Sequence, residues 1–387
     1  MFEIVENQGS GTVIKVVGVG GAGGNAVEYM IRNGVQGVEF IVGNTDAQAL
    51  ARGQARNRIQ LGSTGLGAGA KPEAGRAAAL EARDQIAEAL RGAHMAFITG
   101  GMGGGTGTGA APVVAEIAKE MGILTVAVVT KPFSFEGSRR MQAAEAGIEE
   151  LAQHVDSVIV ILNEKLEEVL GDDISMEDAF GSADNVLKNA VAGISEIINV
   201  PGLINVDFQD VRTVMSEQGM AMMGSATASG VDRARIAAEE AVASPLLEGV
   251  NLSGARGVVV NITANRSSLK LRETKEVMNT IRGFAADDAT IIFGAVYDEA
   301  MGEELRVTVV ATGLGQPQSA RQSKPLQVVR ERTGTDNFAI AGAAPIFSGD
   351  LSGVIHQRRN RVSTIEALAN SGVDKYDIPA FLRKQAD

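Results

Sequence analysis

Two glycine-rich segments, residues 18–25 and 100–109, each lie between a predicted strand and a predicted helix and could bind phosphate. The first contains the spacing G-x-G-x-x-G, and the second has seven glycines in ten positions. Glycine lets backbone N–H groups approach an anion closely, and the amino end of a following helix adds positive potential. Glycine costs roughly 0.5–1 kcal/mol relative to alanine in ordered structure, so the second segment needs a compensating interaction. A phosphate chain bound by successive N–H groups, with the Thr106 and Thr108 hydroxyls as further donors, would supply it.

The first segment taken alone is also typical of a dinucleotide-binding enzyme. Asp46 follows it by about 20 residues, after a second predicted strand, where such a fold places the acid that binds ribose. A nicotinamide-dependent enzyme therefore stays open as an alternative, although it leaves the second segment unexplained. The spacing G-x-x-x-x-G-K-[ST] does not occur, which excludes a P-loop NTPase. Because neither segment carries a lysine, we expect backbone dipoles, Arg140 and Mg²⁺ to balance the phosphate charge.

Asp207 and Asp210 are a pair of carboxylates that could activate water. They are three positions apart at the start of a predicted helix, which places them on one face. A nucleotide hydrolase needs a group that orients and polarises the attacking water, and the glycine segments contain none. The alternative is structural, because Asp at a helix amino terminus interacts favourably with the helix dipole. The spacing alone favours this structural alternative.

The elements that would position these residues alternate along the chain. Short β-branched runs alternate with helical patterns, and nearly all-apolar strands of this kind form a parallel sheet covered on both faces. We predict strands at residues 13–17, 38–42, 96–99, 124–129 and 157–161, and helices at 25–33, 75–91 and 112–121. A long amphipathic helix at 182–198 would be a rigid connector. Beyond it we predict a helix at 211–223 and strands at 258–263, 290–293 and 305–311.

Composition excludes several other classes of protein. The 387 residues carry a formal net charge of -12, which argues against a general nucleic-acid binder. A hydrophobic fraction of 45% supports a substantial core, and the length predicts at least two domains. Cysteine is absent and the three histidines lie far apart in sequence, so neither thiol chemistry nor a zinc site is expected. With no signal-peptide pattern and no apolar run long enough to span a membrane, we expect a cytoplasmic protein.

Several motifs together resemble one family. The run GGGTGTG at residues 103–109 resembles the signature of the tubulin/FtsZ family of GTPases. Further motifs that look like this family are VGGAGGNAV (19–27), NTDAQAL (44–50), GAAPVVAEIAK (109–119), NVDFQDVRTVMSE (205–217), ELRVTVVATG (304–313) and DIPAFLRKQAD (377–387). The resemblance extends over residues 12–316 and the last eleven residues of the chain.

The resemblance implies an α/β fold of the tubulin/FtsZ type. A parallel-sheet GTP-binding domain would cover residues 12–181, followed by a central helix at 182–200 and a smaller α+β, GTPase-activating domain at 201–316. A linker at 317–376 and a partner-binding peptide at 377–387 would form an extended C-terminal tail. GTP or GDP would be the bound nucleotide, with Mg²⁺ carried on it and no metal ligand from the protein.

The resemblance also implies which residues hold the nucleotide. The phosphates would lie against Gly21, Ala22, Gly23, Gly24, Asn25, Gly105, Thr106 and Gly107. Glu136 and Arg140 would contact the ribose and phosphate region, and Asn163, Phe180 and Asp184 would hold the guanine. The residue chemistry agrees, because Phe180 can stack on a purine and the Asp184 carboxylate can accept from guanine N1–H and N2–H₂.

The function that the resemblance implies is GTP-driven assembly in cell division. Subunits would associate head to tail into the filaments of the cytokinetic Z ring, at the division site on the inner face of the cytoplasmic membrane. Asn205, Asp207 and Asp210 of one subunit would complete the GTP site of the next. Contact between two different surfaces gives an open filament when it does not close. A relative that binds nucleotide without hydrolysing it is a second alternative, and the presence of all three residues argues against it.

The last eleven residues would bind partners. Ile378, Pro379, Phe381 and Leu382 lie among charged residues, and an apolar cluster on a polar tether suits docking into a groove. The resemblance implies membrane tethers similar to FtsA and ZipA, and assembly regulators similar to MinC. The linker before this peptide has little periodicity, although Ser363 and Glu366 match the start of a capped helix.

Overall fold

The computed structural model describes residues 11–171, 173–200, 204, 206–217, 220–244, 255–286 and 288–314. The predicted linker at 317–376 and the predicted peptide at 377–387 lie outside these residues, and so does Asn205.

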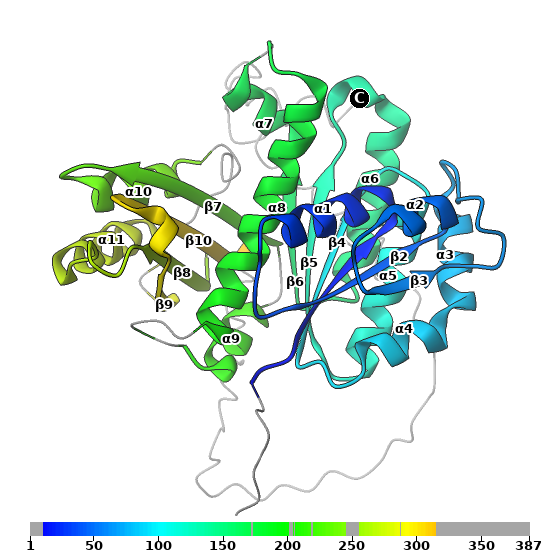
Figure 1. Cartoon of the computed structure of the whole chain (residues 1–387), viewed down its shortest axis with the longest axis horizontal. Helices are drawn as coiled ribbons and strands as arrows, with labels where there is room; N and C mark the ends of the chain where they lie inside the picture. Colours follow the sequence, from blue (N-terminus) through cyan, green and yellow to red (C-terminus); the bar gives the residue numbers. More distant parts are fainter. Residues whose placement is uncertain are drawn as a thin grey trace, which may run out of the picture. The chain divides into compact units, whose positions relative to one another are not determined.

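One sheet runs through both halves of the described chain, in the order β3-β2-β1-β4-β5-β6-β7-β10-β8-β9 (Figure 1). The first half contributes β1 (Ile14–Val19), β2 (Glu39–Asn44), β3 (Asn57–Gln60), β4 (Met95–Gly101), β5 (Leu124–Lys131) and β6 (Ser157–Leu162). All neighbouring pairs among these strands are parallel, which confirms the predicted parallel sheet. Their carboxyl ends therefore meet at one edge of the sheet.

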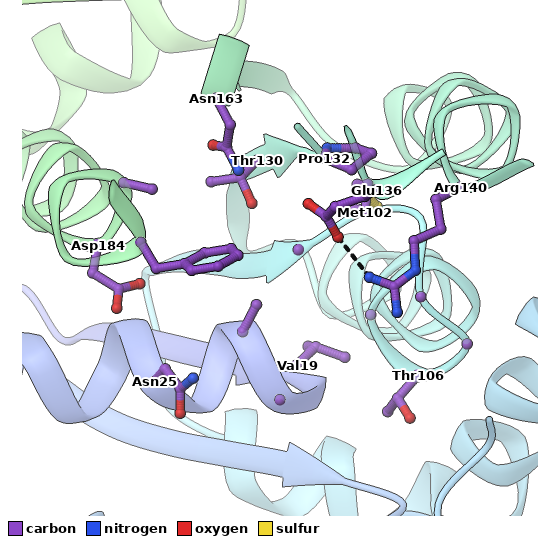
Figure 2. A pocket seen from close by; sticks show the side chains of 18 of the residues that line it. Val19, Asn25, Met102, Thr106, Thr130, Pro132, Glu136, Arg140, Asn163 and Asp184 are labelled. Carbon is purple, nitrogen blue, oxygen red and sulfur yellow. Dashed lines mark hydrogen bonds and ion pairs between the residues drawn. The ribbon is translucent and has the colours of Figure 1, made fainter. Parts of the chain in front are cut away.

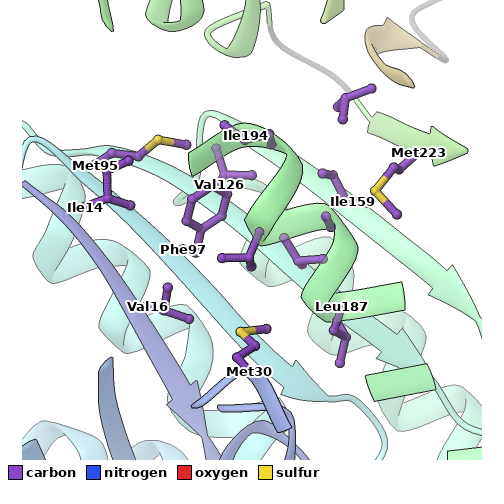
Figure 3. Packing of buried hydrophobic residues seen from close by; sticks show 14 of the residues in the cluster. Ile14, Val16, Met30, Met95, Phe97, Val126, Ile159, Leu187, Ile194 and Met223 are labelled. Carbon is purple, nitrogen blue, oxygen red and sulfur yellow. The ribbon is translucent and has the colours of Figure 1, made fainter. Parts of the chain in front are cut away.

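Helices cover both faces of this parallel part. They are α1 (Gly20–Arg32), α2 (Ala47–Arg52), α3 (Pro72–Glu81), α4 (Arg83–Leu90), α5 (Thr106–Glu120), α6 (Ser138–Ala152) and α7 (Asn163–Leu170). Alternate strand residues point to opposite faces, so Ile14 and Val16 of β1 pack with residues of α1 in one buried cluster (Figure 3). Val17 and Val19 pack with residues of α3, α4 and α5 in the other.

The long helix α8 (Met176–Asn199) connects the two halves. Leu187, Val191 and Ile194 fall on one stripe and are buried against the parallel sheet (Figure 3). The second half contains α9 (Phe208–Met215), β7 (Met220–Ser229), α10 (Arg233–Val242), β8 (Gly257–Ala264), α11 (Leu271–Phe284), β9 (Thr290–Tyr297) and β10 (Glu304–Leu314). β7 continues the first sheet as a parallel neighbour of β6, whereas β10 is antiparallel to both β7 and β8.

Five predicted helices differ from the structure. The helix predicted at 112–121 begins at Thr106, inside the second glycine segment. The helix predicted at 25–33 begins at Gly20, so part of the first glycine segment is itself helical. The helix predicted at 75–91 is two helices, since the backbone turns at Ala82. The connector helix begins at Met176 rather than 182, with the Ser175 side chain as its N-cap. The helix predicted at 211–223 ends at Met215, and Met220 already belongs to a strand, because pairing with β6 and β10 overrides the helical preference of this Met- and Ala-rich run.

The sequence pattern missed several further elements. β3 and helices α2, α6, α7, α10 and α11 were not predicted. Within the described part of the chain, no helix is long and apolar enough to cross a membrane.

Candidate functional site

A cavity of about 390 Å³ lies where β1, β4, β5 and β6 end. Its wall contains all the predicted nucleotide residues except Gly23 and Gly24. It also contains residues that the sequence analysis did not single out, namely Val19, Gly69, Gly101, Met102, Gly104, Thr130, Pro132, Ala183 and Leu187. Figure 2 shows Arg140 and Thr106 on one side of the cavity and Asn163 and Asp184 on the other.

The first glycine segment forms the start of α1 beside the cavity. Gly21, Ala22 and Asn25 line it. Gly23 is buried instead, and a Cβ there would overlap the carbonyl oxygen of Thr99, so its lack of a side chain serves helix–strand packing. Gly24 lines a neighbouring hollow of about 310 Å³ rather than this cavity.

The second glycine segment leads from β4 into α5, and its Gly105, Thr106 and Gly107 line the cavity. Because α5 begins at Thr106, its free N–H groups and its positive end face the cavity. The Thr106 hydroxyl lies 2.6 Å from the Thr45 hydroxyl. The expectation that Thr108 supplies a further donor to phosphate is wrong, because Thr108 is buried outside the cavity wall, beside Gly103 N, which donates to its Oγ1 at 2.9 Å.

Close backbone packing explains part of the glycine density in this segment. A Cβ on Gly105 would overlap the carbonyl oxygen of Gly69, and a Cβ on Gly109 would overlap that of Pro72. A Cβ on Gly107 would overlap the carbonyl oxygen of Gly101. The loop before α3 and the start of that helix therefore pack directly against the second glycine segment and leave no room for side chains at Gly105 and Gly109.

Glu136 and Arg140 form one wall of the cavity and are held by each other. Arg140 Nη1 lies 2.5 Å from Glu136 Oε2, and Glu136 Oε1 accepts from Phe133 N at 3.0 Å. Figure 2 shows this ion pair beside Met102. The Arg140 guanidinium, which the sequence predicted for the phosphate region, lines the cavity.

Side chains form the opposite end of the cavity. Asn163 is 4% exposed, and its Oδ1 has no hydrogen-bond partner among the described residues, so a donor from a ligand would satisfy it. Phe180 is 42% exposed and meets Phe133 edge-on at a centroid distance of 5.3 Å, which leaves ring surface open to the cavity. Burial raises the pKa of the Asp184 carboxyl from 3.8 to about 6, although the charge on Arg32 acts in the opposite direction. This end can therefore offer an amide, an aromatic ring and a carboxylate to a base.

Asp207 and Asp210 lie away from the cavity. Asp207 is the N-cap of α9, where its Oδ1 accepts from Asp210 N at 2.9 Å, and both side chains are exposed. Phe208, between them, contacts the ring of His94 at a centroid distance of 6.2 Å. His94 immediately precedes the 7 residues of β4, whose far end, Gly101, is in the cavity wall. At about 3.3 Å per residue, that strand separates the two places by roughly 20 Å.

Asp46 does not act as the acid of a dinucleotide site. Its Oδ1 accepts from Gln48 N at 2.8 Å and from Ala49 N at 3.3 Å, so it caps α2. It is not part of the cavity wall. The nicotinamide alternative thus loses the one residue outside the glycine segment that supported it.

Comparisons with known proteins agree on one family. Residues 13–171 match the GTPase domain of the Tubulin/FtsZ family, and residues 219–315 match the C-terminal domain of the FtsZ family. The chain is 56% identical to the cell division protein FtsZ of Pseudomonas aeruginosa over 401 residues and 54% identical to that of Pseudomonas putida over 404 residues, with 100% of each chain covered. A solved structure described as an empty FtsZ dimer of M. jannaschii matches with a TM-score of 0.75 and 44% identity, covering 80% of this chain and 89% of that one. The chain therefore belongs to the FtsZ family, and it is a cell-division GTPase whose tubulin-like GTPase domain is followed by an FtsZ C-terminal domain.

Proposed function

We propose that GTP lies across the cavity, with its phosphates against the two glycine segments and its guanine at the side-chain end. The donors at the phosphate end are backbone N–H groups of Gly21 and Gly107, with the Arg140 guanidinium beside them, whereas the Gly105 N–H donates to Gly69 O at 3.1 Å and shapes the loop. At the other end Phe180 stacks on the base, and Asp184 accepts from its N1–H and N2–H₂. The buried, unpartnered Asn163 Oδ1 supports this assignment, because the exocyclic amine of guanine can also donate to it.

Mg²⁺ reaches this site on the nucleotide. Among the described residues, no group of three or more His, Asp or Glu side chains could hold a metal ion. Glu136 lines the cavity but is already paired with Arg140. Phosphate oxygens and water are therefore the expected ligands, as is common for Mg²⁺.

Hydrolysis requires a second copy of the chain. The observation that carries this proposal is the separation of roughly 20 Å between the cavity and the acidic turn, which we define as residues 207–210. The carboxylates of this turn are exposed and cannot reach the phosphates of their own subunit. A neighbour that placed its acidic turn, with Asn205, over the cavity would supply the missing groups. Such a head-to-tail contact joins two different surfaces and propagates as a filament.

The proposed chemistry is in-line attack of water on the γ-phosphorus. As the new P–O bond forms, the bond to the β–γ bridging oxygen breaks, and GDP leaves with the bonding electrons. Asp207 and Asp210 of the neighbour accept hydrogen bonds from the water and orient it, and its proton ends on the phosphate product. Backbone N–H groups of both glycine segments stabilise the charge that develops on the phosphate oxygens.

The location of the filaments and their binding partners complete the proposal. We propose that the filaments form the Z ring at the inner face of the cytoplasmic membrane. Residues 377–387 would bind FtsA-like and ZipA-like tethers and MinC-like regulators. The domain limits at 12–181, 182–200 and 201–316 stay predictions as well.

Substitution of Asp210 tests the proposal. In the presence of Mg²⁺, an Asp210→Ala protein should bind GTP with unchanged affinity and assemble, as followed by right-angle light scattering. Its phosphate release should fall by about 100-fold or more, because a group that acts only in the transition state is lost. Asp232→Ala is the matched control, since Asp232 is another exposed acid at the start of a helix, α10.

Near-normal phosphate release by Asp210→Ala would reject the proposed role of the acidic turn. An absence of scattering by the unmodified protein, despite confirmed GTP binding, would reject assembly as the basis of the reaction. Tighter binding of NAD(H) than of GTP would restore the nicotinamide alternative.

A further inference from the structure

Helix α9 is anchored differently at its two ends. At the carboxyl end, Val214 O accepts from Thr312 Oγ1 at 2.8 Å, and Met215 O accepts from Ser157 Oγ at 2.7 Å. Both hydroxyls are buried. Thr312 belongs to β10 and Ser157 to β6, so hydrogen bonds join this end of α9 to strands from both halves of the chain. The amino end carries the acidic turn and is exposed at Asp207, Gln209 and Asp210.

Phe208 is the one residue of the acidic turn that is not exposed. Its ring meets the His94 ring at an interplanar angle of 65° and a centroid distance of 6.2 Å. An edge-to-face contact of this kind depends on orientation as well as on burial. Phe208 also packs against the buried cluster on this face of the sheet, so the start of α9 is oriented by that cluster together with the His94 ring, immediately before β4.

His94 is itself held in a fixed orientation. Its Nδ1 accepts from Val13 N at 3.0 Å, and its own N donates to Val13 O at 2.9 Å. The first bond requires an unprotonated Nδ1, which leaves the proton of the neutral ring on Nε2. The start of β1 therefore fixes the ring against which Phe208 packs.

We propose that His94 is a positioning residue for GTP hydrolysis. By holding Phe208, it sets the direction in which Asp207 and Asp210 face the neighbouring subunit. This inference rests on the proposed function, in which the acidic turn acts on the neighbour's GTP. A turn released from His94 would pivot about the buried carboxyl end of α9, and small displacements of groups that orient water reduce turnover strongly.

Three substitutions separate the contacts of His94. His94→Asn keeps an acceptor for Val13 N but loses the ring, His94→Phe keeps a ring but loses the acceptor, and His94→Ala loses both. We expect phosphate release per assembled subunit to fall by about 3- to 10-fold in His94→Ala and His94→Asn, and by less in His94→Phe. GTP affinity, measured with a fluorescent analogue below the assembly concentration, should not change. His154→Ala is the matched control, because His154 follows α6 and, among the residues that the structure describes, no hydrogen bond or ring contact joins it to α9.

A double substitution shows whether His94 acts through Phe208. Phe208→Leu alone should lower turnover about as much as His94→Ala. If the two rings act as one unit, the double variant should lose little more than either single variant. Fully additive losses would overturn the inference, as would unchanged turnover in both His94→Ala and His94→Asn.

Mixed filaments identify the interface at which His94 acts. Diluted into an excess of Asp210→Ala subunits, a His94→Ala subunit supplies the working turn while its neighbour supplies the GTP site. Phosphate release per His94→Ala subunit should stay reduced relative to unmodified subunits diluted in the same way. Recovery to the unmodified value would place the defect in the variant's own cavity and overturn the inference. Normal hydrolysis by Asp210→Ala alone would instead refute the proposed function, so the two failures are distinguishable.

Discussion

The two ends of the cavity differ in whether backbone groups or side chains form them. The phosphate end is mainly backbone, contributed by Gly21, Gly105 and Gly107, whereas the base end is mainly the side chains of Asn163 and Asp184 with Phe180. Backbone donors need close approach, which restricts the sequence to glycine over a continuous run. Side chains can come from segments far apart in sequence, and these come from the start of α7 and from α8.

This difference predicts that the phosphate end tolerates no added side chain and that the base end titrates. The carbonyl groups of Gly69 and Pro72 pack against the second glycine segment, so a Cβ on Gly105 or Gly109 would overlap backbone atoms. The base end contains Asp184, whose pKa burial raises to about 6. Substitutions at the two ends should therefore impair GTP binding and stability in different ways.

The largest effect is expected at the phosphate end, from Gly105→Ala. The new Cβ would overlap Gly69 O and lie 3.0 Å from Lys71 N, and both are backbone atoms that cannot move independently. We expect GTP affinity to fall by about 100-fold or more, because several phosphate donors are displaced together, and the thermal midpoint to fall as well. Both are measurable by binding of a fluorescent GTP analogue and by thermal unfolding.

Gly104→Ala is the matched control for stability in the same loop. Nothing lies within 4 Å of a Cβ at that position. Its thermal midpoint should stay within about 2 °C of the unmodified protein, as for an ordinary surface change. If both variants lost stability equally, alanine would be disturbing the loop backbone itself. The overlap with Gly69 would then not be the cause.

A smaller effect, and a dependence on pH, is expected at the base end. In the proposed binding mode guanine donates to the Asp184 carboxylate, and the raised pKa means that this group is protonated below about pH 6. GTP affinity should therefore fall as the pH is lowered through 6, by about fourfold between pH 7.5 and 5.5. Asp184→Asn should bind about 10-fold more weakly at pH 7.5 and lose this pH dependence, whereas Asp178→Asn on the same helix should keep it.

The stability of the nucleotide-free protein should show the opposite dependence on pH from that of GTP affinity. Because the folded-state pKa of Asp184 is above its unfolded value of 3.8, its contribution to stability is full below that value and is lost as the pH rises through about 6. Asp184→Asn should thus raise the thermal midpoint of the nucleotide-free protein at pH 7.5 and have little effect near pH 4. A lower midpoint at pH 7.5 would contradict the assignment of burial as the cause of the shift.

The difference between the backbone end and the side-chain end of the cavity also explains which features the sequence could predict. β1, β4, β5 and β6 are short and mostly apolar runs, and they occur where they were predicted. The two glycine segments were identifiable because their glycines are clustered within eight to ten residues. Gly69 and Thr130 carry no local signal, since they reach the cavity only because the loop before α3 and the end of β5 converge there.

Other errors arose where tertiary contacts override local pattern. Met220–Met223 continue the apolar spacing of α9 but pair with Ala311 and neighbouring residues of β10 as a strand. Ala82 interrupts an alanine-rich helix without a proline or glycine to mark it. Thr108 looks like a phosphate donor until Gly103 N is seen to occupy its oxygen. Each of these outcomes depends on a partner that is remote in sequence or on the exact path of a loop.

The smallest effect is expected just outside the cavity, at Asp46. Its carboxylate caps α2 through Gln48 N and Ala49 N, so Asp46→Ala should lower the free energy of unfolding by about 1 kcal/mol. Asp46→Asn, which keeps an acceptor oxygen, should restore most of that loss. GTP affinity should be unchanged in both variants, because Asp46 is not in the cavity wall. A loss of affinity without a loss of stability would instead make Asp46 a nucleotide ligand, so that side-chain contacts with the nucleotide would extend beyond the base end.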